Sequence, residues 1–134
     1  MGGKFIIAGD VKLEQLDWGK FAFLSNPPNT GATQITSVDG RLCLGKGHDF
    51  HRHPQQEEFI FIVAGKVEQW IDREKRILVP GDSVFIPSGV VHASFGASDD
   101  EARMIAVFSP CVGPVGLETV DMASEAPWKN LRSQ

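Results

Sequence analysis

Hydrophobic residues along this chain fall in short runs or alternate with polar residues, and few recur at the helical period of about 3.6. Glycine, proline, asparagine and aspartate separate the runs, as they do between β-strands. Many short strands joined by tight turns are typical of a closed antiparallel barrel, because closure leaves few exposed edges. We therefore predict an all-β fold. Strands are expected at residues 5–7, 11–13, 21–24, 33–38, 41–44, 58–64, 66–71, 76–79, 83–86, 92–95 and 102–108.

The 134 residues fit one domain, 1–134, without repeats or linkers. We expect N-terminal strands, a barrel core over about residues 33–108, and an irregular C-terminal arm over 109–134 that packs on the barrel or on a partner. Asp39-Gly40 is a typical hairpin turn and predicts a reversal inside the core. Residues 45–50 are predicted to be a loop.

The strand predicted over residues 58–64 is apolar on both faces, which indicates burial on both. Glu58, Ile60 and Ile62 share one face, and Phe59 and Phe61 share the other. If the Glu58 face lines the barrel interior, the two phenylalanines must pack against a second sheet or another subunit. We expect a homodimer through this face, with simple core packing as the alternative.

Charge and composition exclude several classes of partner. The net charge is −4 and the basic residues form no patch, so we expect no nucleic-acid binding. No run approaches the ~18 apolar residues of a membrane span. Cys43 and Cys111 are predicted to be buried free thiols of a cytoplasmic protein, with a single bridge between them as the alternative. The absence of tyrosine excludes mechanisms that need a phenol.

His51 and His53 provide the clearest chemical signal. In an extended chain they point to the same side and can converge on one metal ion. Such a pair also occurs by chance on surfaces, so its neighbours matter. Glu58 begins the next strand with its side chain on the interior face, whereas Glu57 faces the opposite way. His92 lies on a later strand that a neighbouring position in the sheet could bring close.

These residues match the two sequence motifs of the cupin superfamily, and the chain resembles its small single-domain, RmlC-like members. The first motif, G(x)5HxH(x)4E(x)6G, is filled by Gly45, His51, His53, Glu58 and Gly65. The second, G(x)5PxG(x)2H(x)3N, is filled by Gly81, Pro87, Gly89 and His92, with Gly96 in place of the final asparagine. The resemblance implies a double-stranded β-helix, or jelly-roll, barrel.

The resemblance also implies that one divalent metal ion is bound by His51, His53, Glu58 and His92. Imidazole and carboxylate ligands suit Fe, Mn, Ni, Co or Zn, and the sequence does not choose among them. The remaining histidine, His48, is predicted to be a solvated loop residue, or else to lie at the barrel mouth.

Side chains on the same faces as these ligands are expected to line a mostly apolar pocket for a small organic ligand bound at the metal. They are Phe50, Ile60, Ile62, Gln69 and Ser94. Similarity to the quercetinase, acireductone dioxygenase and germin types implies a metal-dependent oxygenase or related oxidoreductase. The alternatives are a non-catalytic small-molecule or metal-binding module and a metal-assisted isomerase of a small sugar or keto acid. For an isomerase, Glu57 and His48 are the only candidate bases once the four ligands are assigned, and the sequence assigns no catalytic residue.

Overall fold

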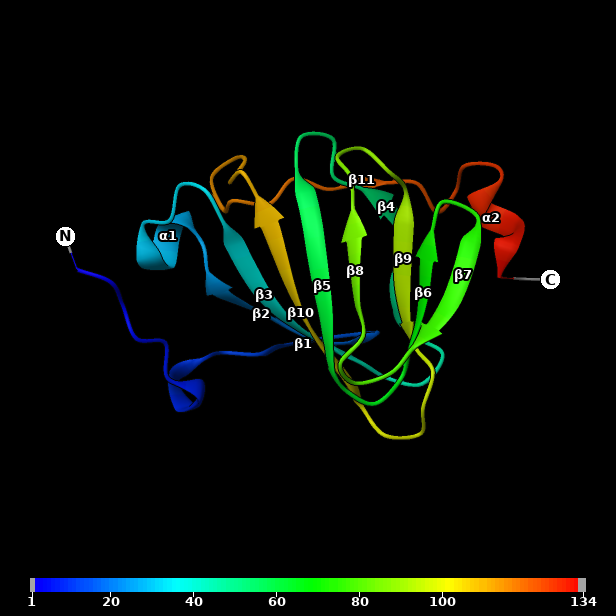
Figure 1. Ribbon diagram of the computed structural model, residues 1–134, viewed down its shortest axis with the longest axis horizontal. Helices are drawn as coiled ribbons and strands as arrows, with labels where there is room; N and C mark the ends of the chain where they lie inside the picture. The colour runs from blue at the N-terminus through cyan, green and yellow to red at the C-terminus, as the bar shows by residue number, and fades with distance from the viewer. Residues whose placement is uncertain (1, 133–134) are drawn as a thin grey trace.

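The computed structural model describes residues 2–132 as two antiparallel β-sheets packed face to face (Figure 1). Sheet A has the order β1 (Glu14–Leu16), β2 (Gly19–Ser25), β3 (Thr36–Leu42), β10 (Ala102–Ser109), β5 (Glu57–Ala64) and β8 (Ser83–Ile86). Sheet B has the order β11 (Val120–Asp121), β4 (Gly47–Arg52), β9 (His92–Gly96), β6 (Val67–Ile71) and β7 (Glu74–Leu78). The short helical turns are η1 (Ala8–Asp10), α1 (Pro27–Thr30) and α2 (Trp128–Leu131). The predicted all-β fold is confirmed.

The period of two along the central strands builds the core between the sheets. In β5 and β10 every second side chain is buried, and these inward residues meet those of the facing sheet. The core formed in this way includes Leu42, Ile60, Ile62, Val67, Ile86, Ala106 and Phe108.

A second apolar cluster lies on the outer face of sheet B. Phe50, Trp70 and Phe95 are buried there beneath residues of the C-terminal segment. Met122, Trp128 and Leu131 supply this cover. The C-terminal segment thus packs on the chain's own sheet. Residues 133 and 134, the end of the predicted arm, lie outside the described residues, as does residue 1.

The predicted hairpin at Asp39-Gly40 is wrong, because β3 runs straight through it. Strand β3 is paired on both sides, with β2 and with β10, and this pairing outweighs the turn preference of the dipeptide. The Asp39 side chain is buried and contacted by Arg41 and Arg103. Gly40 leaves room for the Met104 side chain, which would be 3.4 Å from an added Cβ.

Two further local expectations are corrected. Residues 5–7 and 11–13 form no strand, and the first strand pair is β1 with β2. Residues 47–50, expected to be loop, belong to β4, which pairs with β9. Gly47 makes this pairing possible, because an added Cβ there would lie 1.9 Å from the Ser94 carbonyl oxygen.

The outer face of β5 is exposed in the single chain, contrary to the expected burial on both faces. Phe59 and Phe61 are 45% and 42% exposed, and Phe85 of β8, directly opposite Phe59, is 52% exposed. Cys43 and Cys111 are both free, as predicted, but Cys43 is exposed rather than buried and Cys111 is only half-buried. Within residues 2–132, no helix is long and apolar enough to cross a membrane.

Candidate metal centre

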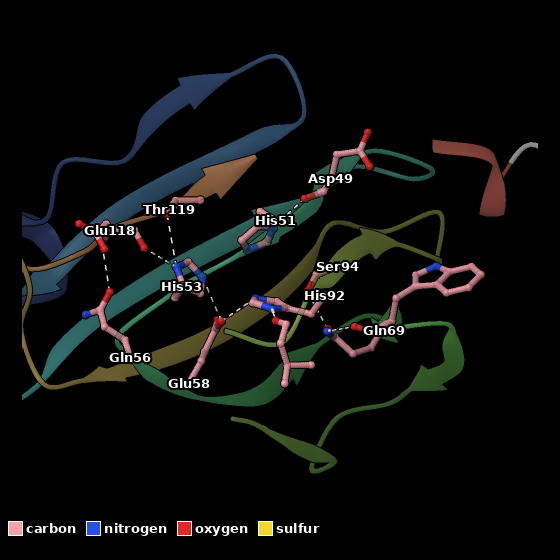
Figure 2. Close-up of polar contacts among 12 residues, drawn as sticks. Asp49, His51, His53, Gln56, Glu58, Gln69, His92, Ser94, Glu118 and Thr119 are labelled. Carbon is pink, nitrogen blue, oxygen red and sulfur yellow. Dashed lines mark hydrogen bonds and ion pairs between the residues drawn. The ribbon is translucent and has the colours of Figure 1, made fainter. Parts of the chain in front are cut away.

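Four side chains from both sheets converge between the sheets (Figure 2). His51 lies in β4, His53 just after it, Glu58 in β5 and His92 in β9. His51 and His92 are direct partners in the β4–β9 pairing. All four side chains are buried, and one nitrogen or oxygen atom from each lies within 4.8 Å of the others.

Backbone carbonyls fix the orientation of all three imidazole rings. A carbonyl oxygen only accepts hydrogen bonds, so each Nδ1 must carry the proton, and a neutral ring then presents a lone pair at Nε2. His51 Nδ1 donates to the Asp49 carbonyl (2.6 Å), His53 Nδ1 to that of Glu118 (2.9 Å), and His92 Nδ1 to that of Val90 (2.9 Å).

The buried ligand atoms lack hydrogen-bonding partners that could satisfy them. Glu58 Oε1 lies 2.8 Å from His92 Nε2 and 3.3 Å from His53 Nε2. With Nδ1 protonated on both rings, these contacts bring together three acceptors, and the three atoms have no other partner among residues 2–132. Such a cluster is stable only if a proton or a cation lies among the acceptors. Three nitrogens and one carboxylate are a donor set that fits a divalent metal ion.

The charge states also suit a metal ion. Burial by itself would raise the pKa of Glu58, but the close contact with the His53 and His92 rings outweighs burial and lowers the pKa to about 2. Burial, followed by repulsion from His48, lowers the pKa of His51 well below its usual range. Near neutral pH the site therefore offers an ionised carboxylate together with a neutral His51 imidazole, the forms that coordinate metals.

His48 lies in the cavity wall rather than in a solvated loop. Its ring stacks on His51 with centroids 3.6 Å apart, and Trp18 lies parallel to it at 6.2 Å. Burial lowers the pKa of His48 to about 4. A register shift in β4 between His48 and His51 lets both rings face the cavity, although they are three residues apart. Alternation along the sequence could not reveal this irregularity.

The cavity wall differs from the predicted lining. Of the five residues expected there, Ser94 is in the wall, and the other walls are mostly apolar. Ile60 and Ile62 lie in the main core, and Phe50 lies on the opposite face of β4 from His51. Gln69 is the partner of Ser94 in the β6–β9 pairing, and its Oε1 accepts a hydrogen bond from the Ser94 hydroxyl at 2.6 Å. Wall residues that sequence reasoning missed include Trp18, Phe21, Met104, Phe108 and Leu117, brought in from β2, β10 and the loops.

Comparison with known proteins identifies the family. The cupin-domain family model matches residues 40–108, which hold all four converging side chains. The chain is also 32% identical over 109 residues to "Polyketide synthase CurC" of Streptomyces cyaneus, covering 81% of this chain and 70% of that protein. The protein belongs to the cupin-domain family, and the jelly-roll barrel implied by the sequence motifs is confirmed.

Solved structures share this fold at low sequence identity. The polyketide cyclase RemF from Streptomyces resistomycificus superposes with a TM-score of 0.72 at 22% identity, covering 96% of this chain and 92% of that one. Bacillus subtilis oxalate decarboxylase, described with Mn(II) centres, superposes with a TM-score of 0.71 at 18% identity, covering 83% of this chain and 30% of that one. At these identities the likeness supports the fold alone.

Proposed function

We propose that the protein holds one divalent metal ion on His51, His53, Glu58 and His92 and binds a small organic molecule at it. The observation that carries this proposal is the set of buried atoms His53 Nε2, His92 Nε2 and Glu58 Oε1, which face one another and have no hydrogen-bond partner among residues 2–132. A bound ion would act as a Lewis acid toward oxygen atoms of the ligand. The metal is one of Fe, Mn, Ni, Co and Zn.

The chain's own residues would select and orient the ligand. Apolar walls exclude water, and the stacked rings of Trp18, His48 and His51 form an aromatic part of the wall beside the ligand nitrogens. The apolar and aromatic wall favours a planar, conjugated molecule with carbonyl or enol oxygens over a sugar. A polyanion is disfavoured because the wall holds no lysine or arginine among residues 2–132.

Removing ligands one at a time tests the site. His51→Ala and Glu58→Gln should lose bound metal, measured by elemental analysis after loading, and should lose the rise in melting temperature that metal gives the natural protein. Glu57→Gln is the matched control, since its carboxylate is adjacent in sequence but exposed. A double variant His51→Ala/Glu58→Ala that retains one ion per chain would refute the site.

For the reaction, we propose oxygenation or a related oxidation of the bound molecule. Apart from the four ligands, His48 is the one titratable side chain in the described cavity wall, which leaves few groups for the proton transfers of an isomerase. Ring closure of a polyketide-type substrate is the second candidate. The names of CurC and RemF favour it, as does the aromatic wall.

A substrate panel separates these reactions. Metal-loaded protein would be incubated with flavonols, enediols, 1,3-diketones and poly-β-ketones while oxygen uptake and product mass are followed. Oxygenation consumes dioxygen and adds oxygen atoms, whereas ring closure with dehydration consumes none and removes water. Tight binding of a panel member without conversion would favour the non-catalytic module.

The proposed protein is a cytoplasmic homodimer. The exposed Phe59, Phe61 and Phe85 support a homodimer formed through the outer face of sheet A. The free thiols of Cys43 and Cys111 support a reducing, cytoplasmic compartment.

A further inference from the structure

Gln56 occupies a buried position between two of the converging side chains. It lies in the turn that joins β4 to β5, three residues after His53 and two before Glu58, and is 1% exposed. A buried amide must find hydrogen-bond partners for both its nitrogen and its oxygen, since a buried polar group without a partner destabilises the fold. The partners of this amide all belong to one distant segment, residues 110–118.

The Gln56 amide fastens that segment to the turn. Its Nε2 donates to the Pro110 carbonyl at 2.7 Å and to the Gly116 carbonyl at 3.0 Å, and its Oε1 accepts from the Glu118 backbone N–H at 3.0 Å. Both amide hydrogens are therefore used, and the oxygen is used as well. Only a glutamine-type amide can supply two donors and an acceptor in this arrangement.

The fastened segment in turn holds His53. The carbonyl of Glu118 accepts the hydrogen bond from His53 Nδ1 at 2.9 Å, while the N–H of the same residue is held by Gln56 (Figure 2). Leu117, the preceding residue, lies in the cavity wall. The geometry points to Gln56 as a positioning residue that fixes the tautomer and ring orientation of His53 through Glu118. The metal-binding part of this inference rests on the proposed function, and the tautomer part does not.

Neighbouring residues provide matched comparisons. Gln55 has the same side chain in the same turn but is exposed, so Gln55→Glu repeats the charge change without the buried contacts. Thr36 donates to the Gly116 carbonyl at 2.8 Å and anchors the same segment two residues before Glu118. Thr36→Val therefore weakens the segment's attachment while leaving the Gln56–Glu118–His53 chain of contacts intact.

The test compares Gln56→Glu with Gln55→Glu and Thr36→Val. The Gln56→Glu side chain has the shape of glutamine, but a carboxylate oxygen replaces the amide nitrogen. This oxygen cannot donate to the Pro110 and Gly116 carbonyls and is repelled by them. In metal-free protein, long-range ¹H–¹⁵N correlation spectra should show His53 protonated at Nδ1 in the natural chain and in both comparison variants. In Gln56→Glu this single tautomer should be lost. Competition with a chelating dye should show Co²⁺ affinity lowered about 10–100-fold in Gln56→Glu, as for other groups that orient metal ligands, and changed less than about twofold in Gln55→Glu.

The outcomes separate the alternatives. If Gln56→Glu keeps both the His53 tautomer and the Co²⁺ affinity, the inference is overturned. If Gln56→Glu and Thr36→Val lower thermal stability alike and both leave His53 unchanged, Gln56 is only a structural anchor and the inference also fails. If no variant and not even the natural chain binds Co²⁺, the proposed function fails, while the tautomer spectra still decide the role of Gln56. Should Gln56→Glu not fold, Gln56→Met removes the same contacts without adding charge and is read in the same way.

Discussion

The three imidazoles differ in where their orienting carbonyls come from. His51 and His92 each donate to the carbonyl two residues earlier in the chain, so the local strand conformation orients them. His53 instead donates to Glu118, 65 residues away in sequence. Two of the rings are thus set by local structure, and the third depends on how the C-terminal segment packs.

Gly47 provides a test of the close strand approach beside these rings. Gly47→Ala would place a Cβ 1.9 Å from the Ser94 carbonyl oxygen, forcing β4 and β9 apart. We expect a loss of about 1–3 kcal/mol in the free energy of unfolding, measured by urea denaturation, because backbone cannot yield as a flexible side chain does. Gly9→Ala, where an added Cβ meets no atom within 4 Å, should change stability by less than about 0.5 kcal/mol. Equal stability of the two variants would contradict the close approach.

The C-terminal segment is attached to sheet B by a charged contact as well as by apolar packing. Glu68 Oε2 accepts from Trp70 Nε1 at 2.7 Å and from Arg132 Nε at 2.8 Å. The guanidinium of Arg132 also lies 3.6 Å from the centroid of the Phe95 ring. Figure 1 shows α2 beside sheet B, on the side of the molecule opposite the N-terminal segment. The ionisation of Glu68 should therefore control how firmly this segment is held.

Acid should loosen the segment. Burial raises the pKa of Glu68, but the hydrogen bonds from Arg132 and Trp70 outweigh it and lower the pKa below its usual 4.5. A lowered folded-state pKa means that the contact stabilises the fold above pH 4.5 and that this contribution disappears as the pH falls through the folded value. We expect Trp70 fluorescence to change over this acid range, with a stability effect under about 1 kcal/mol because the pair is partly exposed. Glu68→Gln should lack the transition, and an identical titration in both proteins would disprove the assignment.

The exposed aromatic residues on the outer face of sheet A are the basis for expecting a homodimer. At ~200 Å² per ring, Phe59, Phe61 and Phe85 expose together about 280 Å², well short of the ~800 Å² that each partner gives to a stable interface. The homodimer proposed above would therefore need an interface that extends beyond the rings. The N-terminal segment is one source, since Phe5 and Ile7 are 97% and 58% exposed.

Removing the rings should separate the subunits. A Phe59→Ser/Phe85→Ser variant is expected to run as a monomer in size-exclusion chromatography with light scattering, whereas the natural chain runs as a dimer at micromolar concentration. Ile77→Ser is the control, because Ile77 is 51% exposed but lies in β7 of the other sheet. A natural chain that is monomeric at all concentrations, or a dimer in the double variant, would contradict the proposed face.

The sequence by itself determined the strand-rich class, the family and the four converging side chains. Strand alternation placed Glu58 inside and Glu57 outside, and the spacing within two motifs named His92. These features depend on neighbours within a few residues or on spacings that the barrel imposes, so they can be read along the chain.

Tertiary structure alone decided the rest of the site. The register shift in β4 points His48 into the cavity. Pairing of β3 on both sides keeps Asp39-Gly40 in a continuous strand instead of a turn. Trp18 and Leu117 reach the cavity wall from elements far apart in the sequence. Gln56 and Glu118 come into contact only in the folded chain, and the orientation of His53 depends on that contact. Such contacts depend on three-dimensional packing between segments, which no local pattern of hydrophobic and polar residues encodes.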